Sequence, residues 1–268
     1  MKEFLRFRAL LYELTVRDIK VKYRRSILGL LWTVLNPLLM MLVLCFVFSK
    51  LFRFDIENYA IYVLSGQVIF NYFQMSTTDA MMAILNNGTL IKKVYVPKYM
   101  LVLVKILSGT VYLLASFVAL LVVMAVTGSK IAGPLLFVVP VFFSLMIFSF
   151  GMGLLLAAIT VRFRDVMHLY GVFCTALFYL TPIMYPFSIL PEYVQGVVYY
   201  NPLTAIMEVF RMIVLEGQNP EPGRMFYSLG TSFVMLLIGR AVFKKRQKTF
   251  ILDLSLIHIS EPTRLDVI

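Results

Sequence analysis

Four polar residues share one narrow face of an otherwise apolar stretch. They are Gln67, Asn71, Gln74 and Thr78, at positions i, i+4, i+7 and i+11, which is the spacing of one helix face. Polar groups that face lipid cost free energy, so this face should meet protein or water. Two interpretations stay open: hydrogen bonds between helices, or the lining of a path for a polar substrate. Asp79 lies beside the inner end of this polar stripe, where it could relay protons or form an ion pair.

The element that carries the stripe belongs to a strongly apolar chain. Hydrophobic residues make up 60% of the sequence and the mean hydropathy is +0.86, against about 45–50% apolar residues in soluble proteins. Eight Lys and Arg residues precede position 26, and residues 27–48 carry no charge. Such a run is long enough to cross a bilayer as a helix, and positive flanks stay in the cytoplasm. The sequence therefore predicts an integral membrane protein with a cytoplasmic N-terminus.

Hydropathy predicts an all-α membrane protein with six transmembrane helices. The expected spans are residues 27–48, 59–83, 100–126, 134–161, 169–187 and 225–243. With this division, 20 Lys and Arg residues fall in inside segments and 5 in outside segments. The asymmetry obeys the positive-inside rule and predicts that both termini are cytoplasmic.

The N-terminal segment has the pattern of an amphipathic helix lying along the membrane surface. Its apolar positions recur at spacings of three and four: Phe4, Phe7, Leu11 and Leu14. Two i,i+4 ion pairs are expected on its polar side, Glu13–Arg17 and Asp18–Lys22. The alternative is a solvated basic leader, which the clean periodicity disfavours.

The stretch 188–223 is rich in proline and does not resemble a simple loop. Its two apolar pieces, residues 193–200 and 202–215, are too short or too charged to cross a membrane. Helices that enter the membrane and turn back would suit this pattern if protein covers their ends. An ordinary extracellular loop is the alternative.

Motifs for catalysis or nucleotide binding are absent from the sequence. It contains neither the GxxxxGK[ST] pattern of a P-loop nor the HExxH pattern of a zinc site, and His168 and His258 stand apart from other candidate ligands. Cys45 and Cys174 lie within apolar runs and have no metal-site spacing. We therefore expect no cofactor in this chain. The basic residues flank apolar spans, which indicates membrane lipids as partners and not nucleic acid.

Several stretches in order along the chain together resemble the permeases of type-2 ABC exporters, in particular those that export O-antigen, teichoic acid and related polysaccharides. The matching stretches are residues 17–23, 28–32, 36–38, 90–98, 162–166, 181–186, 190–192 and 201–204. The resemblance implies a multi-pass permease of the bacterial plasma (inner) membrane that forms a channel with a second copy of itself. Two separate ATPase subunits would bind ATP and Mg, and the cargo would be a lipid-linked glycan.

The resemblance also assigns two candidate regions. The cytoplasmic segment that would couple to the ATPase comprises Leu90, Ile91, Lys92, Lys93, Val94, Tyr95 and Pro97. We expect a short helix there that ends near Tyr95, because Pro97 disfavours helical geometry at the preceding residue. A basic loop resting on anionic lipid is the alternative. The candidate re-entrant region contains Pro182, Tyr185, Pro186, Pro191, Asn201 and Pro202.

Residues 1–254 are expected to form one transmembrane domain. Residues 255–268 match nothing in the resemblance and are interpreted as a non-native or disordered tail. Two other functions remain open: a type-2 permease for a drug or lipid, and a membrane-embedded enzyme that acts on lipid-linked substrates.

Overall fold

The computed structural model describes residues 6–24, 28–49, 56, 58–129 and 133–250, and every regular element in these ranges is helical. The predicted tail and Phe4 lie outside the described residues. The α-helices are α2 Arg8–Tyr23, α3 Trp32–Leu44, α4 Tyr59–Met81, α5 Ala83–Asn86, α6 Gly88–Lys93, α7 Lys98–Val126, α8 Val138–Thr160, α9 Val166–Leu180, α10 Glu192–Tyr199, α11 Pro202–Val214 and α12 Pro222–Arg246. Short irregular helices are η1 Gly29–Leu31, η2 Cys45–Ser49, η3 Gly133–Phe137 and η4 Phe187–Ile189. The prediction of an all-α fold is confirmed for the described residues.

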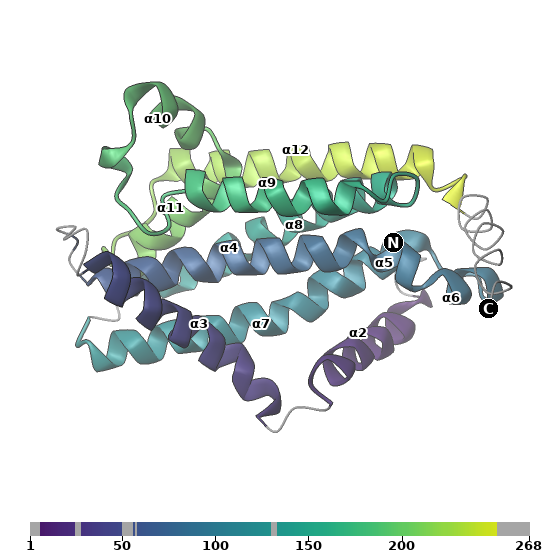
Figure 1. Cartoon of the computed structure of the whole chain (residues 1–268), viewed down its shortest axis with the longest axis horizontal. Helices are drawn as coiled ribbons and strands as arrows, with labels where there is room; N and C mark the ends of the chain where they lie inside the picture. The colour runs from purple at the N-terminus through teal and green to yellow at the C-terminus, as the bar shows by residue number, and fades with distance from the viewer. Residues whose placement is uncertain (1–5, 25–27, 50–55, 57, 130–132, 251–268) are drawn as a thin grey trace, which may run out of the picture.

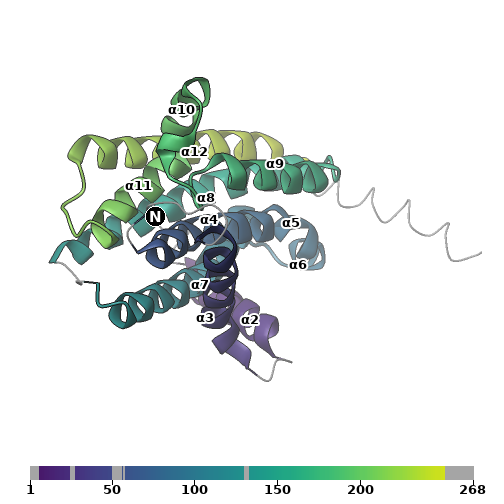
Figure 2. The ribbon, with the colours of Figure 1, turned by 60° about the vertical axis from the view of Figure 1, so that its left-hand side comes forward.

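The long helices form a bundle with α4 at its centre (Figure 1). Helices α7 and α8 pack on α4, and α12 packs along α8. In both views α9 and α12 lie on one side of α4 and α8, while α2, α3 and α7 lie on the other (Figure 2). Most residues of α4 are buried, including Gln67 and Ser76. The helix that carries the polar stripe is thus largely enclosed by protein, as the cost of exposing polar groups to lipid requires.

Among the described residues, three helical segments are long and apolar enough to cross a membrane: α7, residues 134–160 and α12. A fourth crossing arises if α10 and α11, bent by 82° at their junction, count as one broken span. The apolar helices Trp32–Val47 and α9 are shorter. Helix α4 has 23 residues, but the amides of Gln67, Asn71 and Gln74 lower its hydropathy. The chain is therefore a multi-pass membrane protein.

The fifth predicted span, residues 169–187, differs from the helix in the structure. Helix α9 begins at Val166 and ends at Leu180, and Thr181 is already extended with φ −80° and ψ 133°. The chain turns here because Pro182 disfavours helical geometry at the residue before it. The turn is then held by side chains from α4 and α11, as described below.

Helices α8 and α12 approach closely along a row of small residues. A Cβ atom built on Gly239 would lie 2.0 Å from the backbone oxygen of Gly151. Seven residues before each of these glycines, the hydroxyl oxygens of Ser144 and Ser232 lie 2.9 Å apart and share a hydrogen bond across the interface. Small residues and interhelical hydroxyl bonds are typical of helix packing in membranes, where no hydrophobic force drives apolar helices together.

Candidate functional site: a polar groove beside the central helix

Three of the four stripe residues line a groove on α4. Asn71, Gln74 and Thr78 face a cavity of about 410 Å³, whose far wall is formed by Asn36 and Pro37 of α3 with neighbouring side chains. Amide and hydroxyl groups both donate and accept hydrogen bonds, so the groove could bind a neutral hydroxyl-rich ligand. The face predicted from residue spacing therefore opens onto space in this part of its length.

Gln67, the fourth stripe residue, lies apart from this groove. It is 1% exposed, and neither its amide oxygen nor its amide nitrogen has a hydrogen-bond partner in the described part of the chain. A buried amide without partners costs free energy. The stripe thus has an open part at Asn71, Gln74 and Thr78 and a closed part at Gln67.

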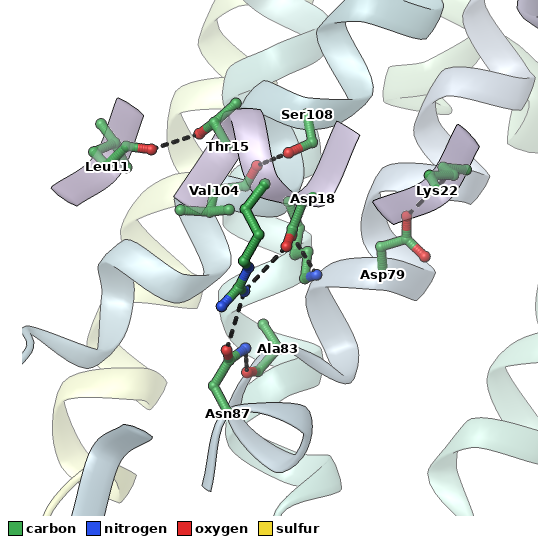
Figure 3. Close-up of polar contacts among 11 residues, drawn as sticks. Leu11, Thr15, Asp18, Lys22, Asp79, Ala83, Asn87, Val104 and Ser108 are labelled. Atoms are coloured by element: carbon green, nitrogen blue, oxygen red, sulfur yellow. Dashed lines mark hydrogen bonds and ion pairs between the residues drawn. The ribbon is translucent and has the colours of Figure 1, made fainter. Parts of the chain in front are cut away.

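A second cavity of about 290 Å³ adjoins the groove toward α2. Its lining comes from α2, α4 and α7, and it shares Met75, Asp79 and Tyr112 with the groove. Asp79, which the sequence left open between a proton relay and an ion pair, lies 3.8 Å from the ammonium nitrogen of Lys22. Figure 3 shows these two side chains facing each other between α2 and α4.

Helix α2 packs against α7 with its apolar face inward. Leu11 and Leu14 are buried, at 8% and 7% exposure, as the predicted amphipathic face requires. Polar contacts then fix its register: Asp18 accepts from Lys105 of α7 at 2.5 Å, and Arg17 donates to the Asn87 side chain at 3.5 Å (Figure 3).

The ion pairs predicted within α2 are not the ones that form. Asp18 pairs with Lys105 and with the adjacent Arg17, at 3.1 Å, while Lys22 pairs with Asp79. The predicted Asp18–Lys22 pair is therefore wrong, because both charges find partners on α7 and α4. An i,i+4 pair contributes only about 0.2–0.5 kcal/mol, so a better tertiary partner displaces it easily.

The candidate coupling segment consists of α5, α6 and an extended connection to α7. Helix α6 ends at Lys93, two residues before the position expected, and Val94 is extended with φ −136° and ψ 139°. Val96 and Pro97 are buried, and Pro97 is the N-cap of α7. Burial of these two residues, together with the proline restriction, explains why the helix ends early.

The side chains of this segment point in two directions. Ile91 is buried at 8% exposure, and Leu90 packs partly against the core. Lys92 and Lys93 are exposed, as are Val94 at 54% and Tyr95 at 78%. The ring of Tyr95 lies 6.4 Å from that of Phe7 at the start of α2. The surface open to a partner is therefore residues 92–95, next to α2.

One of the five basic residues in the predicted outside segments, Arg211, binds the candidate re-entrant region. Arg211 of α11 is 7% exposed. Its guanidinium donates to the backbone oxygens of Pro182 at 2.7 Å and of Tyr62 and Ile183, each at 3.1 Å. The ring of Tyr62 lies 3.7 Å from the guanidinium carbon, a cation–π geometry. The spacing of residues along the sequence could not predict this contact, because the acceptors of Arg211 are backbone oxygens of segments far away in the chain.

The same turn is bound by two tyrosines of α4. The Tyr62 hydroxyl donates to the backbone oxygen of Tyr185 at 2.8 Å, and the Tyr59 hydroxyl donates to that of Met184 at 2.7 Å. Pro182, a candidate from the sequence, thus contributes its carbonyl group. Tyr185, a second candidate, contributes both its carbonyl group and its hydroxyl, which donates to the backbone oxygen of Tyr179. These hydrogen bonds join the start of α4 to the turn after α9.

A second buried arginine joins α11 to α12. Arg224 donates to the Glu208 carboxylate at 2.7 Å and to the backbone oxygen of Tyr199 at 2.7 Å. Asn201 caps α11 by accepting from the backbone N–H of Leu203 at 3.0 Å, with Pro202 at the first helical position. Pro191 and Pro186 precede α10 and η4 as their N-caps. The prolines therefore mark helix starts, and the arginines fasten the helices to the bundle.

The fold and the groove define a helical multi-pass membrane protein that encloses a polar surface and lacks a nucleotide-binding motif in its sequence. The family model described as ABC-2 type transporter matches residues 9–215, and the chain belongs to this family. The resemblance found in the sequence is confirmed.

Relatives cover nearly the whole chain. It is 28% identical over 243 residues to the O-antigen export system permease protein RfbA of Klebsiella pneumoniae, covering 90% of this chain and 93% of the relative. The protein of the same name from Myxococcus xanthus is 31% identical over 257 residues, covering 93% and 97%. The polysialic acid transport protein KpsM of Escherichia coli is 23% identical over 241 residues, covering 89% and 93%.

Cysteine labelling tests which part of the stripe is open. In a background with Cys45 and Cys174 replaced by Ala, Asn71→Cys and Gln74→Cys are expected to react with a small water-soluble thiol reagent. Gln67→Cys is expected to react slowly, because position 67 is buried. The controls Val68→Cys and Phe73→Cys, each 1% exposed, should also be slow. Equal labelling of positions 71 and 73 would contradict a one-sided groove.

Proposed function

We propose that this chain is the permease subunit of an ATP-driven exporter that moves a lipid-linked polysaccharide, of the O-antigen, capsule or teichoic acid type, across the bacterial plasma membrane. The observation that carries the proposal is the near full-length match to relatives named for export of O-antigen and transport of polysialic acid. The functional unit is the single domain of residues 1–254, and the tail 255–268 is dispensable. ATP and Mg bind to a partner subunit.

The proposed topology has six crossings and cytoplasmic termini. The crossings are α3 with η2, α4, α7, α8, α9 and α12, and the pair α10–α11 is re-entrant on the outer side. The 82° bend between α10 and α11 supports this arrangement, as does the anchoring of both helices to α12 through Arg224. The excess of positive charge in the inside segments supports the orientation.

The substrate path is proposed to follow the open part of the stripe. Sugar hydroxyls exchange hydrogen bonds readily with the amides of Asn71 and Gln74 and the hydroxyl of Thr78, and these groups face a cavity. Gln67 would join the path when the helices packed around it move apart, which would also give its amide hydrogen-bond partners. This explains why a membrane helix retains so many polar groups.

The exporter is proposed to contain two copies of this chain and two ABC ATPase subunits. The exposed residues 92–95 form the docking surface for the ATPase, next to Phe7 of α2. ATP-driven closure of the ATPases would push this segment and α2 together, since their rings are in contact. Rigid-body movement of α2 and α7 would then reorient the spans in an alternating-access cycle.

Replacing Tyr95 tests the docking surface. Tyr95→Ala is expected to uncouple ATP hydrolysis from export, because an aromatic anchor at an interface contributes about 2 kcal/mol or more. Neutralising Lys92 and Lys93 with Gln should have a smaller effect, since rim charges mainly change association rates. Transport and ATPase activity of the purified complex in vesicles measure both. Tyr193→Ala, at an exposed tyrosine of α10, is the control. If the lysine variants are the more damaging, the segment rests on lipid.

A deletion strain tests the function itself. Loss of this chain is expected to cause a lipid-linked glycan to accumulate on the cytoplasmic side of the membrane while surface polysaccharide disappears. Complementation with the intact chain should restore export. Unchanged surface polysaccharide, combined with sensitivity to a drug or altered lipid distribution, would instead support a permease for a small amphiphile. A glycan that accumulates in chemically altered form would point to a membrane enzyme.

A further inference from the structure

Two ionic pairs line the cavity between α2, α4 and α7, and they differ in how completely they are satisfied. Asp18 is held by Lys105 at 2.5 Å and by Arg17 at 3.1 Å, and its side chain is 13% exposed. Lys22 and Asp79 are 3.8 Å apart and are 45% and 49% exposed. A separation of 3.8 Å exceeds the range of a hydrogen bond. Asp18 is therefore bound by two cations and mostly shielded from solvent, whereas Lys22 and Asp79 are exposed and can still bind a further charged group.

Lys22 and Asp79 retain hydrogen-bonding capacity toward the cavity. The Lys22 ammonium has three N–H donors, and one points to the sulfur of Met75 at 3.1 Å, a weak acceptor. In the part of the chain that the structure describes, Lys22 is the sole ionic partner of Asp79. The carboxylate has about four acceptor sites. The pair therefore presents a donor cation and an acceptor anion side by side.

The cavity has the size and lining of a headgroup site. Its volume of about 290 Å³ is far above the roughly 10–15 Å³ that a single water molecule requires on the same measure. Ser108 and Tyr112 add hydroxyl groups, while Ile19 and Val111 provide apolar walls. A ligand with a small charged head and an apolar tail would match both parts of this lining.

We propose that this cavity binds the headgroup of a zwitterionic phospholipid that carries a phosphate and a primary ammonium group. The phosphate accepts hydrogen bonds from Lys22, and the ammonium donates to Asp79. An anionic headgroup without an ammonium would satisfy Lys22 but leave Asp79 beside a like charge. A quaternary ammonium has no N–H to donate. The charges of the cavity balance, with Lys22 and Lys105 against Asp18 and Asp79, which disfavours a purely anionic ligand.

The bound lipid would act as a wedge between α2 and α4. Helix α2 is fastened to α7 through Asp18 and Lys105, but its contact with α4 near the cavity runs through the open Lys22–Asp79 pair. A headgroup in this gap would bridge the two helices and set their spacing. The inference rests on the proposed position of α2 at the membrane surface, but it does not require export of any particular substrate.

Selective lipid retention tests the proposal. The permease, in complex with its ATPase, is reconstituted in bilayers with equal amounts of phosphatidylethanolamine, phosphatidylcholine and phosphatidylglycerol, then extracted with detergent. Lipids that stay bound are quantified by mass spectrometry. Phosphatidylethanolamine is expected to be enriched about fivefold over each of the others, the scale of one favourable charged contact. Asp79→Asn and Lys22→Gln should each abolish the enrichment.

Matched controls separate this site from general surface charge. Lys20→Gln and Glu13→Gln alter exposed charges on the same helix and should retain the full enrichment. Equal retention of the three lipids by the native chain would overturn the proposal, as would enrichment that survives both Asp79→Asn and Lys22→Gln. Equal enrichment of phosphatidylglycerol would show that charge alone attracts lipid and would also overturn it. Because retention is measured without transport, failure here leaves the proposed export function separately testable.

Discussion

Arg211→Ala is expected to destabilise the protein by about 3 kcal/mol or more, since it removes four hydrogen bonds that a charged group donates. A hydrogen bond to a charged group contributes about 1.5–3 kcal/mol. The oxygens of Pro182 and Tyr62 keep a second donor, from the hydroxyls of Tyr62 and Ser65, whereas the oxygen of Ile183 loses its bond to the guanidinium. The contacts link α4, the turn after α9 and α11, so their loss should loosen the whole outer end of the bundle. The unfolding temperature in detergent should fall by about 6 to 12 °C.

Two further variants make the Arg211 prediction specific. Arg211→Lys keeps the charge but has three rotating donors in place of a planar five-donor group, so it should recover only part of the loss. Arg240→Ala, at an exposed arginine of α12, should change the unfolding temperature little. A stability of Arg211→Ala equal to that of Arg240→Ala would show that water replaces the lost donors.

Gly239→Ala is expected to separate α8 from α12. The added methyl group would lie 2.0 Å from the backbone oxygen of Gly151, and backbone atoms in a packed helix pair cannot move aside as a flexible side chain would. Overpacking costs about 1–3 kcal/mol and occasionally more, and here the serine bond between Ser144 and Ser232 would stretch as well. Thermal unfolding and the yield of folded protein in detergent measure the effect.

The same substitution nine residues earlier on α12 provides the control. Gly230 has open space where its Cβ would be, so Gly230→Ala should be neutral or should stabilise the helix by up to about 1 kcal/mol. The two variants add the same methyl group to the same helix. If Gly239→Ala were as stable as Gly230→Ala, the close approach of the two helices would not exist in the folded protein.

Residue spacing predicted which elements form and which faces they bury. The intervals of four and three residues from Phe7 to Leu11 and from Leu11 to Leu14 predicted the buried face of α2. The spacing of Asn71, Gln74 and Thr78 predicted a common face on α4. The two apolar pieces of the proline-rich stretch, residues 193–200 and 202–215, correspond closely to α10 and α11. These features depend on the helical repeat and on backbone restrictions, which a sequence states directly.

The periodicity of residue types could not predict contacts between segments that are far apart in the sequence. Asp18 pairs with Lys105 and not with Lys22, because the helices that bring better partners come from elsewhere in the chain. Ile91 was expected among residues available to a partner, but the return of the chain into α7 buries it. Arg211 binds backbone oxygens, and every residue type has a backbone oxygen. The pattern of residue types therefore could not predict which oxygens Arg211 binds.

Hydropathy, charge asymmetry and ordered motifs are local properties of the chain, and they were enough to predict a helical membrane protein of the ABC-2 type. Which part of the polar stripe faces open space depends on how the helices pack. The packing of α3 and α7 against α4 leaves Asn71 and Gln74 facing a cavity, whereas Gln67 lies at a level of α4 that is buried. Periodicity places Gln67, Asn71 and Gln74 on one face of α4. The positions of the neighbouring helices determine which of these residues are buried and which line a cavity.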